Sequence, residues 1–253
     1  MAQHANRKIS VITICRDSIE TIEQCIKSVL SQTYSNLEYI VIDGGSSDGT
    51  VEVIKSYSDQ IYIWSSARDH GIADAMNQGL QKATGELVIF LHSDDYFSGD
   101  GVIASFIEKM DPRYDIYACN ILLGHGESWV IKRPRGFGLW MNMKTGVYHQ
   151  GSVCRRDVFR KIGNFDVTFS IAMDYDFFLR AYRAGLKLQK VDIVLANMRN
   201  TGIGSRLDWR HLKTRLDEEK KVHKKNADSL SLGIIYRLYW PIYTLYRRVR
   251  SIC

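Results

Sequence analysis

The stretch Leu87-Val88-Ile89-Phe90-Leu91-His92-Ser93-Asp94-Asp95-Tyr96 decides the fold. Its first half is an apolar run that is too short for a helix and rich in branched residues, which is typical of a buried parallel strand. The run then stops on two adjacent carboxylates. Since ligands of open α/β sheets bind beyond the carboxyl ends of the strands, Asp94 and Asp95 could hold a hard divalent cation that carries phosphates. A turn or helix-capping pair is the alternative.

The same alternation of strands and helices extends through the preceding residues. Apolar runs predict strands at 8–15, 37–42 and 61–64, in addition to 87–91. Apolar residues at helical spacing predict helices at 20–32, 51–57 and 72–84, with Gly85 as the C-cap of the last. We therefore expect an α/β fold with a Rossmann-like, mostly parallel central sheet, flanked by helices and built through right-handed crossovers.

The second half is less regular. Strands are expected at 116–123, 129–132 and 186–194, and helices at 157–162 and 174–184, with Gly185 ending the second helix. A polar loop follows at 199–205. The composition then changes to a basic helix and an aromatic tail, so we expect a main domain of residues 1–205 and a helical tail of residues 206–253.

Charge and cysteine content narrow the class of protein. The net charge is +6, but residues 206–253 hold 12 basic and 5 acidic residues, which leaves the main domain nearly neutral at −1. This distribution argues against a nucleic-acid binder. Five scattered cysteines without a CxxC pair argue against a zinc site or a disulfide framework and favour a reducing compartment. Without a secretory pattern or an apolar run of 18 residues, a cytoplasmic location is expected.

Polar residues also follow the other early strands. Asp43 ends the second strand, and Gly44 and Gly45 permit close approach of a ligand, so this segment could contact a nucleotide or could only form a turn. Asp69 precedes the helix at 72–84 and is a candidate ligand contact. Neither a GxGxxG nor a GxxxxGK[ST] motif is present.

The segment Asp174-Tyr175-Asp176 opens a helix in the second half. A carboxylate at a helix start is most often a cap. The alternative is a general base, which must be separate from acids committed to a metal, and Asp174 fits because it is distant in sequence from Asp94 and Asp95. Arg180 could hold Asp174 in an ion pair or could be a solvated surface charge.

Taken together, seven motifs in order resemble family 2 glycosyltransferases of the GT-A fold, and most closely the bacterial members that build O-antigen, capsule or other surface polysaccharides. The resemblance covers residues 8 to 206. It rests on Ser10-Val11-Ile12-Thr13, Asp43-Gly44-Gly45-Ser46-Ser47-Asp48-Gly49-Thr50, Asp69-x-Gly-Ile-x-Asp-Ala-Met-Asn77-x-Gly79, Ser93-Asp94-Asp95, His149-Gln150, Gly163-x-Phe165-Asp166 and Asp174-Tyr175-Asp176-x-x-x-Arg180.

On the donor side, the resemblance implies that Thr13, Cys15 and Asp43 lie against the nucleotide base and that Asp69 lies near the base or ribose. Asp95 would be the ligand of Mg²⁺ or Mn²⁺, with Asp94 nearer the ribose or donor sugar. The sequence departs from many relatives at Gly44, where they carry a second acid. The protein is therefore expected to make fewer fixed contacts with the nucleotide base, and uridine is the expected nucleoside of the donor.

On the acceptor side, the resemblance implies that Asp174 is the catalytic base of an inverting transfer. Asp176 is a further acceptor-side candidate and the next choice of base if Asp174 is not the base. His149 and Gln150 would shape the acceptor site or be structural. The loop from Arg199 to Arg206 could close over the diphosphate, its arginines pairing with phosphate oxygens.

The tail suggests where the acceptor is found. Tyr236, Tyr239, Tyr243 and Tyr246 form an aromatic helix face flanked by arginines, which suits the interface of a membrane. Packing of these aromatics on the main domain or on a second subunit of a homo-oligomer is the alternative. The membrane interpretation agrees with an acceptor saccharide on a lipid diphosphate at the cytoplasmic face of the inner membrane.

The sequence thus predicts an inverting, metal-dependent glycosyltransferase that uses a nucleoside-diphosphate sugar. Two other classes stay open at this point. A sugar nucleotidyltransferase would want a glycine-rich basic loop after the first strand, and Cys15-Arg16-Asp17-Ser18 does not provide one. A non-catalytic sugar-nucleotide-binding protein would bind the donor without turnover.

Overall fold

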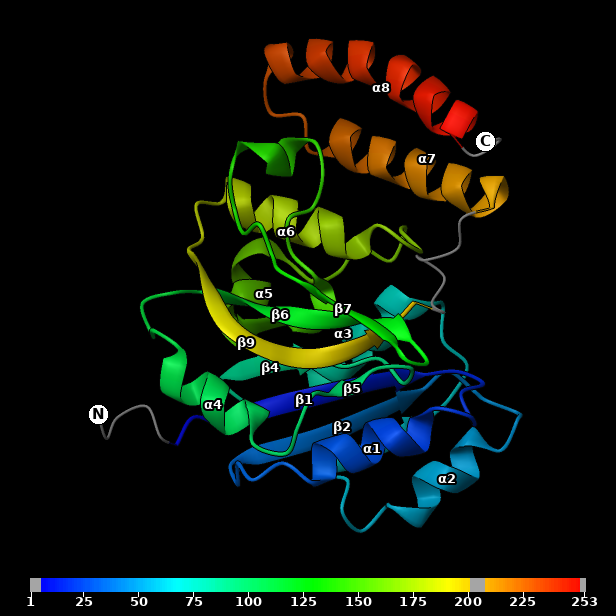
Figure 1. Cartoon of the computed structure of the whole chain (residues 1–253), viewed down its shortest axis with the longest axis vertical. Coiled ribbons are helices and arrows are strands. Elements are labelled where there is room, and N and C mark those ends of the chain that lie inside the picture. Colours follow the sequence, from blue (N-terminus) through cyan, green and yellow to red (C-terminus); the bar gives the residue numbers. More distant parts are fainter. Residues whose placement is uncertain (1–5, 201–207, 251–253) are drawn as a thin grey trace.

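The computed structural model describes residues 6–200 and 208–250 (Figure 1). One mixed sheet has the strand order β3-β2-β1-β4-β8-β6-β9-β5, and β7 pairs with β6. The strands are β1 Ile9–Cys15, β2 Leu37–Asp43, β3 Ile63–Ser66, β4 Leu87–Phe90, β5 Tyr96–Phe97, β6 Ile116–His125, β7 Ser128–Lys132, β8 Ser152–Arg155 and β9 Leu188–Arg199. The helices are α1 Ile22–Leu30, α2 Thr50–Ser56, α3 Ile72–Lys82, α4 Val102–Lys109, α5 Arg156–Ile162, α6 Met173–Arg183, α7 Trp209–Lys225 and α8 Leu230–Arg250, with short 3-10 turns η1 Leu139–Asn142 and η2 His149–Gly151.

The first half of the sheet confirms the parallel arrangement. β1 pairs in parallel with β2 and β4, and β2 pairs in parallel with β3. Cys15 lies opposite Asp43 in register, and Asp43 lies opposite Ser66. The carboxyl ends of these strands therefore meet at one edge of the sheet, where ligands of such folds bind.

Several boundaries differ from expectation. β8 is antiparallel to both β4 and β6, and the sequence did not predict it, β5 or α4. β8 has only four residues, which is too few for an alternation of apolar and polar side chains to be recognised. The third strand is shifted from 61–64 to 63–66. Gly185 has a φ of +71° and ends α6 as expected.

Gly85, by contrast, is not a helix cap. α3 ends at Lys82, and Ala83 is already extended. A Cβ atom at Gly85 would lie 2.7 Å from the backbone nitrogen of Ser10. Gly85 is therefore a close-packing residue against β1, which explains why a glycine stands there without a left-handed conformation.

Apolar side chains fill both faces of the sheet. Alternate residues of β1, β2 and β4 pack against α3, α5 and α6 on one face, and their neighbours pack against α1 and α4 on the other. Burial of each large aliphatic or aromatic side chain is worth about 1.5–3 kcal/mol, so this two-sided burial fixes the position of the strand ends.

The C-terminal segment adds a further layer. α7 and α8 lie one above the other over α6, on the side away from the sheet (Figure 1). Leu212 and Leu216 of α7 pack with Tyr236 and Trp240 of α8. Part of the predicted aromatic face is thus buried inside the protein. None of the helices in residues 6–200 and 208–250 has the length and apolar character needed to cross a membrane.

Candidate active site

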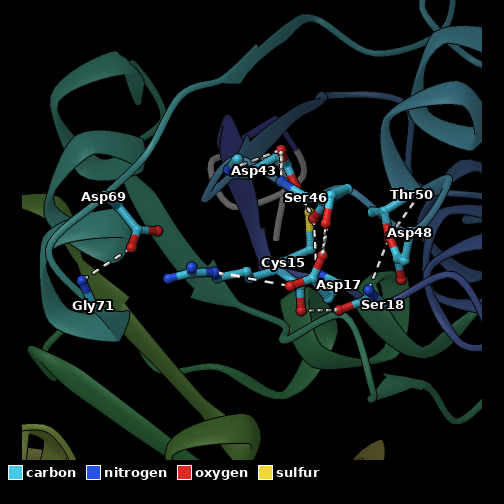
Figure 2. A network of polar contacts seen from close by, with 12 residues as sticks. Cys15, Asp17, Ser18, Asp43, Ser46, Asp48, Thr50, Asp69 and Gly71 are labelled. Carbon is cyan, nitrogen blue, oxygen red and sulfur yellow. Dashed lines mark hydrogen bonds and ion pairs between the residues drawn. The ribbon is translucent and has the colours of Figure 1, made fainter.

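The edge formed by β1, β2 and β4 gathers most of the residues predicted for the donor. Beyond β4 the chain stays beside β1, because the Ser93 amide donates to the Ile14 carbonyl at 3.2 Å. The Ser93 hydroxyl lies 2.8 Å from that of Ser18. Cys15, Asp17, Ser18, Asp43 and Ser46 form one polar network at this edge (Figure 2). The strand ends and the acidic segment are therefore neighbours, as expected.

Asp43 organises the loop that follows it. Its side chain is 1% exposed and accepts hydrogen bonds from the Gly45 and Ser46 amides, each at 3.0 Å, and from the Ser66 hydroxyl at 2.6 Å. The Cys15 thiol lies 3.6 Å from its other oxygen, which also accepts from the Ser46 hydroxyl. Burial would raise the pKa of Asp43, but these hydrogen bonds outweigh it and lower that pKa. Asp43 is thus an ionised anchor for residues 44–46.

Thr13 is fully buried, so its side chain is not exposed at the surface where a nucleotide base would bind. Its hydroxyl is buried, accepts from the Tyr39 hydroxyl at 3.1 Å, and lies 3.5 Å from the Cys25 sulfur. Cys15 is also buried, and burial raises the pKa of its thiol. These contacts favour an indirect role for Thr13 and Cys15, in which they support the Asp43 loop.

Asp69 lies against Gly44, the residue that follows β2. One carboxylate oxygen of Asp69 accepts from the Gly71 amide at 3.0 Å (Figure 2). The other lies over Gly44, where an added Cβ would stand only 2.4 Å away from it. A larger residue at Gly44 would displace this carboxylate, so Gly44 and Asp69 form a matched pair.

Asp94 and Asp95 lie with His92 in one cluster. The candidate ligand atoms of these three residues all lie within 4.8 Å of one another. Asp95 is 1% exposed, and burial, together with the charge of Asp94, raises its pKa well above the usual range. Two close carboxylates in a buried setting need a cation to stay ionised. The Nε2 atom of His92 is buried without a hydrogen-bond partner among the described residues. These residues therefore fit a divalent metal ion.

Arg199, at the end of β9, is joined to this cluster across the sheet. Its amide donates to Asp95 at 3.1 Å, and its guanidinium donates to the Asp94 carbonyl and to Gln24. The guanidinium also lies 5.2 Å from the Tyr96 ring centroid. Arg199 thus fixes the acidic loop. Residues 201–206 of the predicted closing loop, Arg206 included, lie outside the described residues.

Asp174 stands at the start of α6, a separate element. Its carboxylate accepts from the Tyr175 amide at 2.7 Å. Burial raises the pKa of Asp174 to about 6, and the nearby charge of Glu219 adds to this effect. A carboxyl group with such a pKa is ionised at neutral pH and basic enough to accept a proton, as a general base must.

Asp176 has a different environment. It is fully buried and accepts from Arg180 at 2.8 Å, Lys225 at 3.1 Å and Asn226 at 2.9 Å. These three donors favour a structural role. Arg180 also donates to the carbonyls of residues 162–164. The expectation that Arg180 pairs with Asp174 or stays solvated is therefore wrong, since its carboxylate partner is Asp176.

His149 and Gln150 lie in η2, close to the acidic cluster. The His149 ring is buried 5.4 Å from that of His92 and 5.5 Å from that of Phe90. Burial lowers the pKa of His149 to about 3, so it is neutral. Gln150 is half-buried beside it.

α7 contributes residues that the motifs did not indicate. Glu218 is buried, and its carboxylate accepts from three consecutive amides at the entry to α6: Ser170 at 3.0 Å, Ile171 at 2.8 Å and Ala172 at 2.9 Å. Asp174 comes two residues later. In a basic helix with many exposed charges, nothing in the sequence distinguishes Glu218 from its neighbours.

His223 adds a second link from α7. The Tyr175 hydroxyl donates to the Met141 carbonyl at 2.8 Å, so the His223 Nε2, 2.7 Å away, must donate to Tyr175. The Trp240 indole donates to the His223 Nδ1 at 3.1 Å. His223 is therefore a neutral imidazole, and burial lowers its pKa to about 4. Through it, α8 is connected to the helix that bears Asp174.

Comparison with known proteins gives the family. The model of "Glycosyl transferase family 2" matches residues 10–187. An uncharacterized glycosyltransferase of Mycobacterium tuberculosis is 38% identical over 207 residues, which are 78% of this chain and 77% of that protein. The mannosyltransferase PcManGT from Pyrobaculum calidifontis, in complex with GDP-Man and Mn²⁺, is similar with a TM-score of 0.70 and 18% identity, over 97% of this chain and 74% of that one. S. aureus TarS 1–349, in complex with UDP-GlcNAc, is similar with a TM-score of 0.66 and 18% identity, over 85% and 64%.

The two structural likenesses agree with the GT-A fold that the sequence indicated. With the strand edge, the acidic cluster and the family match taken together, this chain belongs to glycosyl transferase family 2.

Proposed function

We propose that this protein is a metal-dependent, inverting hexosyltransferase. It moves a hexose or an N-acetylhexosamine from a UDP-sugar to a saccharide on a lipid diphosphate, in the synthesis of a surface polysaccharide such as O-antigen or capsule. The observation that carries the proposal is Asp174, whose half-buried carboxyl group has a pKa of about 6 on a helix separate from the acidic cluster. Inverting transfer needs a base of this kind apart from the metal-binding acids.

In the proposed reaction, Asp174 accepts the proton of an acceptor hydroxyl. The hydroxyl oxygen forms a bond to the anomeric carbon of the donor sugar. The bond from that carbon to the diphosphate oxygen breaks, and its electron pair leaves with the nucleoside diphosphate. Since attack and departure occur on opposite faces of the carbon, its configuration inverts. Glu218 and His223 act as positioning residues by holding the segment that carries Asp174.

The donor side has its own division of roles. Asp95 would hold Mn²⁺ or Mg²⁺, with Asp94 nearer the ribose or donor sugar, and a metal ion bound there supplies electrostatic stabilisation of the departing diphosphate. The free oxygen of Asp69 would accept from the base or ribose, since its other oxygen already accepts from Gly71. Structural neighbours that bind UDP-GlcNAc, or GDP-Man and Mn²⁺, support a nucleoside-diphosphate sugar and a metal ion as ligands of this fold.

The outer face of α8 supports a membrane-bound acceptor. It exposes an aliphatic stripe of Leu230, Ile234, Ile235, Leu238, Ile242, Leu245 and Val249. Exposed arginines at 237, 248 and 250 flank this stripe. An apolar face with basic flanks suits the surface of an anionic bilayer. We infer that residues 1–205 are the catalytic domain and that residues 206–253 place it at the cytoplasmic face of the inner membrane.

The test is a transfer assay with a panel of nucleoside-diphosphate sugars and a synthetic lipid-diphosphate saccharide acceptor. We expect turnover of one UDP-sugar, its loss in EDTA, its recovery with Mn²⁺ or Mg²⁺, and an inverted anomeric configuration in the product by NMR. Asp95→Ala should lose the activity, whereas Asp217→Ala, an exposed acid of α7, should keep it. A retained configuration would contradict the proposed mechanism, and donor binding without turnover on any acceptor would indicate a non-catalytic binder.

A further inference from the structure

We propose that His92 is a nitrogen ligand of the metal ion, and that this site consequently selects Mn²⁺ over Mg²⁺. The inference rests on the proposed function, which places a divalent cation at Asp95. It goes further by naming a ligand outside the acidic pair and by identifying the preferred ion.

The position of His92 follows from the end of β4. The strand ends at Phe90, and the chain continues beside β1 through the Leu91 amide, which donates to the Ile12 carbonyl at 2.9 Å. His92 therefore sits on the same strand extension as Asp94. A ring nitrogen of His92 and one oxygen each from Asp94 and Asp95 lie within 4.8 Å of one another. One cation can reach all three atoms from a point between them, since metal–ligand bonds to nitrogen and oxygen are about 2.0–2.6 Å long.

The surroundings of His92 leave a ring nitrogen without a partner. Its Nε2 atom is buried and makes no hydrogen bond within residues 6–200 and 208–250. The neighbouring His149 does not fill this need, because its own Nε2 is buried and unpartnered as well, and the rings stand 5.4 Å apart. The rings of Phe90 and Phe165 also pack against His149. Buried polar atoms are normally satisfied, so a histidine that has an unpartnered ring nitrogen and also lies beside two carboxylates indicates an absent cationic partner.

The donor set determines which ion fits best. Mg²⁺ demands oxygen ligands in near-ideal octahedral geometry, whereas imidazole nitrogen suits the transition metals. A set of two carboxylates and one imidazole therefore favours Mn²⁺ over Mg²⁺. If a third carboxylate replaced the imidazole, the affinities of the site for Mn²⁺ and Mg²⁺ would be closer to each other.

Pulsed EPR on bound Mn²⁺ tests the ligand directly, without any measurement of activity. The full chain is labelled with ¹⁵N-histidine and examined with Mn²⁺ alone and with Mn²⁺ and UDP, whose own nitrogen stays ¹⁴N. We expect ¹⁵N modulation of the Mn²⁺ signal in the wild type. His125→Asn, which changes an exposed histidine at the end of β6, should keep the modulation. His92→Asn should lose it and bind Mn²⁺ at least about tenfold more weakly.

His92→Asp guards against a loss that is caused only by misfolding. This variant should lose the ¹⁵N modulation yet bind Mn²⁺, and its Mn²⁺/Mg²⁺ affinity ratio should be smaller than that of the wild type. Modulation that persists in His92→Asn, or Mn²⁺ bound in the wild type without modulation, would overturn the inference. Nitrogen-ligated Mn²⁺ in a protein that transfers no sugar would uphold the metal assignment and refute the proposed function alone.

Discussion

Two regions of the candidate site are held together in different ways: the edge of the sheet formed by the ends of β1, β2 and β4 (the donor edge), and α6, which bears the proposed catalytic base Asp174 (the base helix). At the donor edge, Asp43 is held by the amides of residues 45 and 46 and by Ser66, all within 23 positions of it. At the base helix, the amides before Asp174 are held by Glu218, 46 to 48 positions away in α7. The Asp43 loop is therefore held by residues close to it in sequence, whereas the entry to α6 is held by a contact from outside the family-matched region 10–187. The difference teaches that the helix bearing the proposed base depends on contacts from α7 for its position.

Among the variants that test this difference, Glu218→Ala should have the largest effect on stability and turnover. The change leaves three amides at the entry to α6 without their acceptor, in a buried setting. Each unsatisfied buried group costs about 1–3 kcal/mol, so for three amides we expect a loss of at least about 3 kcal/mol in the free energy of unfolding, together with a lower kcat. Urea denaturation and the transfer assay measure the two effects.

Asp217→Ala is the matched control, since Asp217 is the adjacent residue of α7 and is exposed. It should change neither quantity. If Glu218→Ala kept the kcat of the wild type, the long-range contact would have no part in positioning Asp174.

Gly44→Ala should break the donor edge in a narrower way. The new Cβ would collide with the Asp69 carboxylate, which lies 2.4 Å from its position. We expect a higher KM for the donor with kcat little changed, because the chemistry at Asp174 is not touched. Gly99→Ala, at a site where nothing lies within 4 Å of an added Cβ, should leave KM unchanged. Equal KM values in the two variants would show that Asp69 does not contact the donor.

Acid should weaken the link between α8 and α6. The pKa of His223 is lowered to about 4 by burial, while the unfolded chain has a value near 6.5. Below pH 6.5 the unfolded state binds a proton that the folded state refuses, so stability falls as the pH drops from about 6.5 to about 4, by up to about 3 kcal/mol. The contribution of His223 is the difference in pH dependence of unfolding between the wild type and His223→Gln. Identical profiles would mean that His223 does not remain neutral in the fold.

The outer face of α8 should matter least for chemistry. Ile234→Ser with Ile242→Ser replaces two exposed side chains of the aliphatic stripe. Co-sedimentation with anionic vesicles should decrease strongly, whereas turnover of a short, water-soluble acceptor should be unchanged. Glu52→Ser with Lys55→Ser on α2 serves as the control for surface changes elsewhere. Undiminished vesicle binding would argue against this face as the membrane contact.

Most residues of the donor edge could be predicted from the sequence, but the contacts that hold the segment bearing Asp174 could not. The apolar run into Asp94 and Asp95 and the Asp43 loop are contiguous, so period and turn chemistry reveal them. Asp174 was found through a motif, but Glu218 and His223 act on it through space and look like ordinary positions of a charged helix. The proposed role of His92 also depends on the three-dimensional structure, because an unpartnered ring nitrogen and a place beside two carboxylates set this residue apart.

The tail shows how one pattern can serve two surfaces. The aromatic spacing predicts either a membrane face or a face packed on the protein. Tyr236 and Trp240 are buried against α7, and the exposed face of α8 is mainly aliphatic. Periodicity located an amphipathic helix, but it could not tell which face meets the protein. β8 escaped prediction because only four residues form it, and its antiparallel direction depends on neighbours from both halves of the chain.

The most direct test of the central claim is the transfer rate of Asp174→Asn beside its affinity for the donor nucleotide. The amide keeps the shape of the side chain but cannot accept the acceptor's proton. We predict that transfer falls by about 10²–10⁴-fold while calorimetric binding of UDP with Mn²⁺ stays within about twofold of the wild type. Full transfer by Asp174→Asn would contradict the account and place the base on another residue.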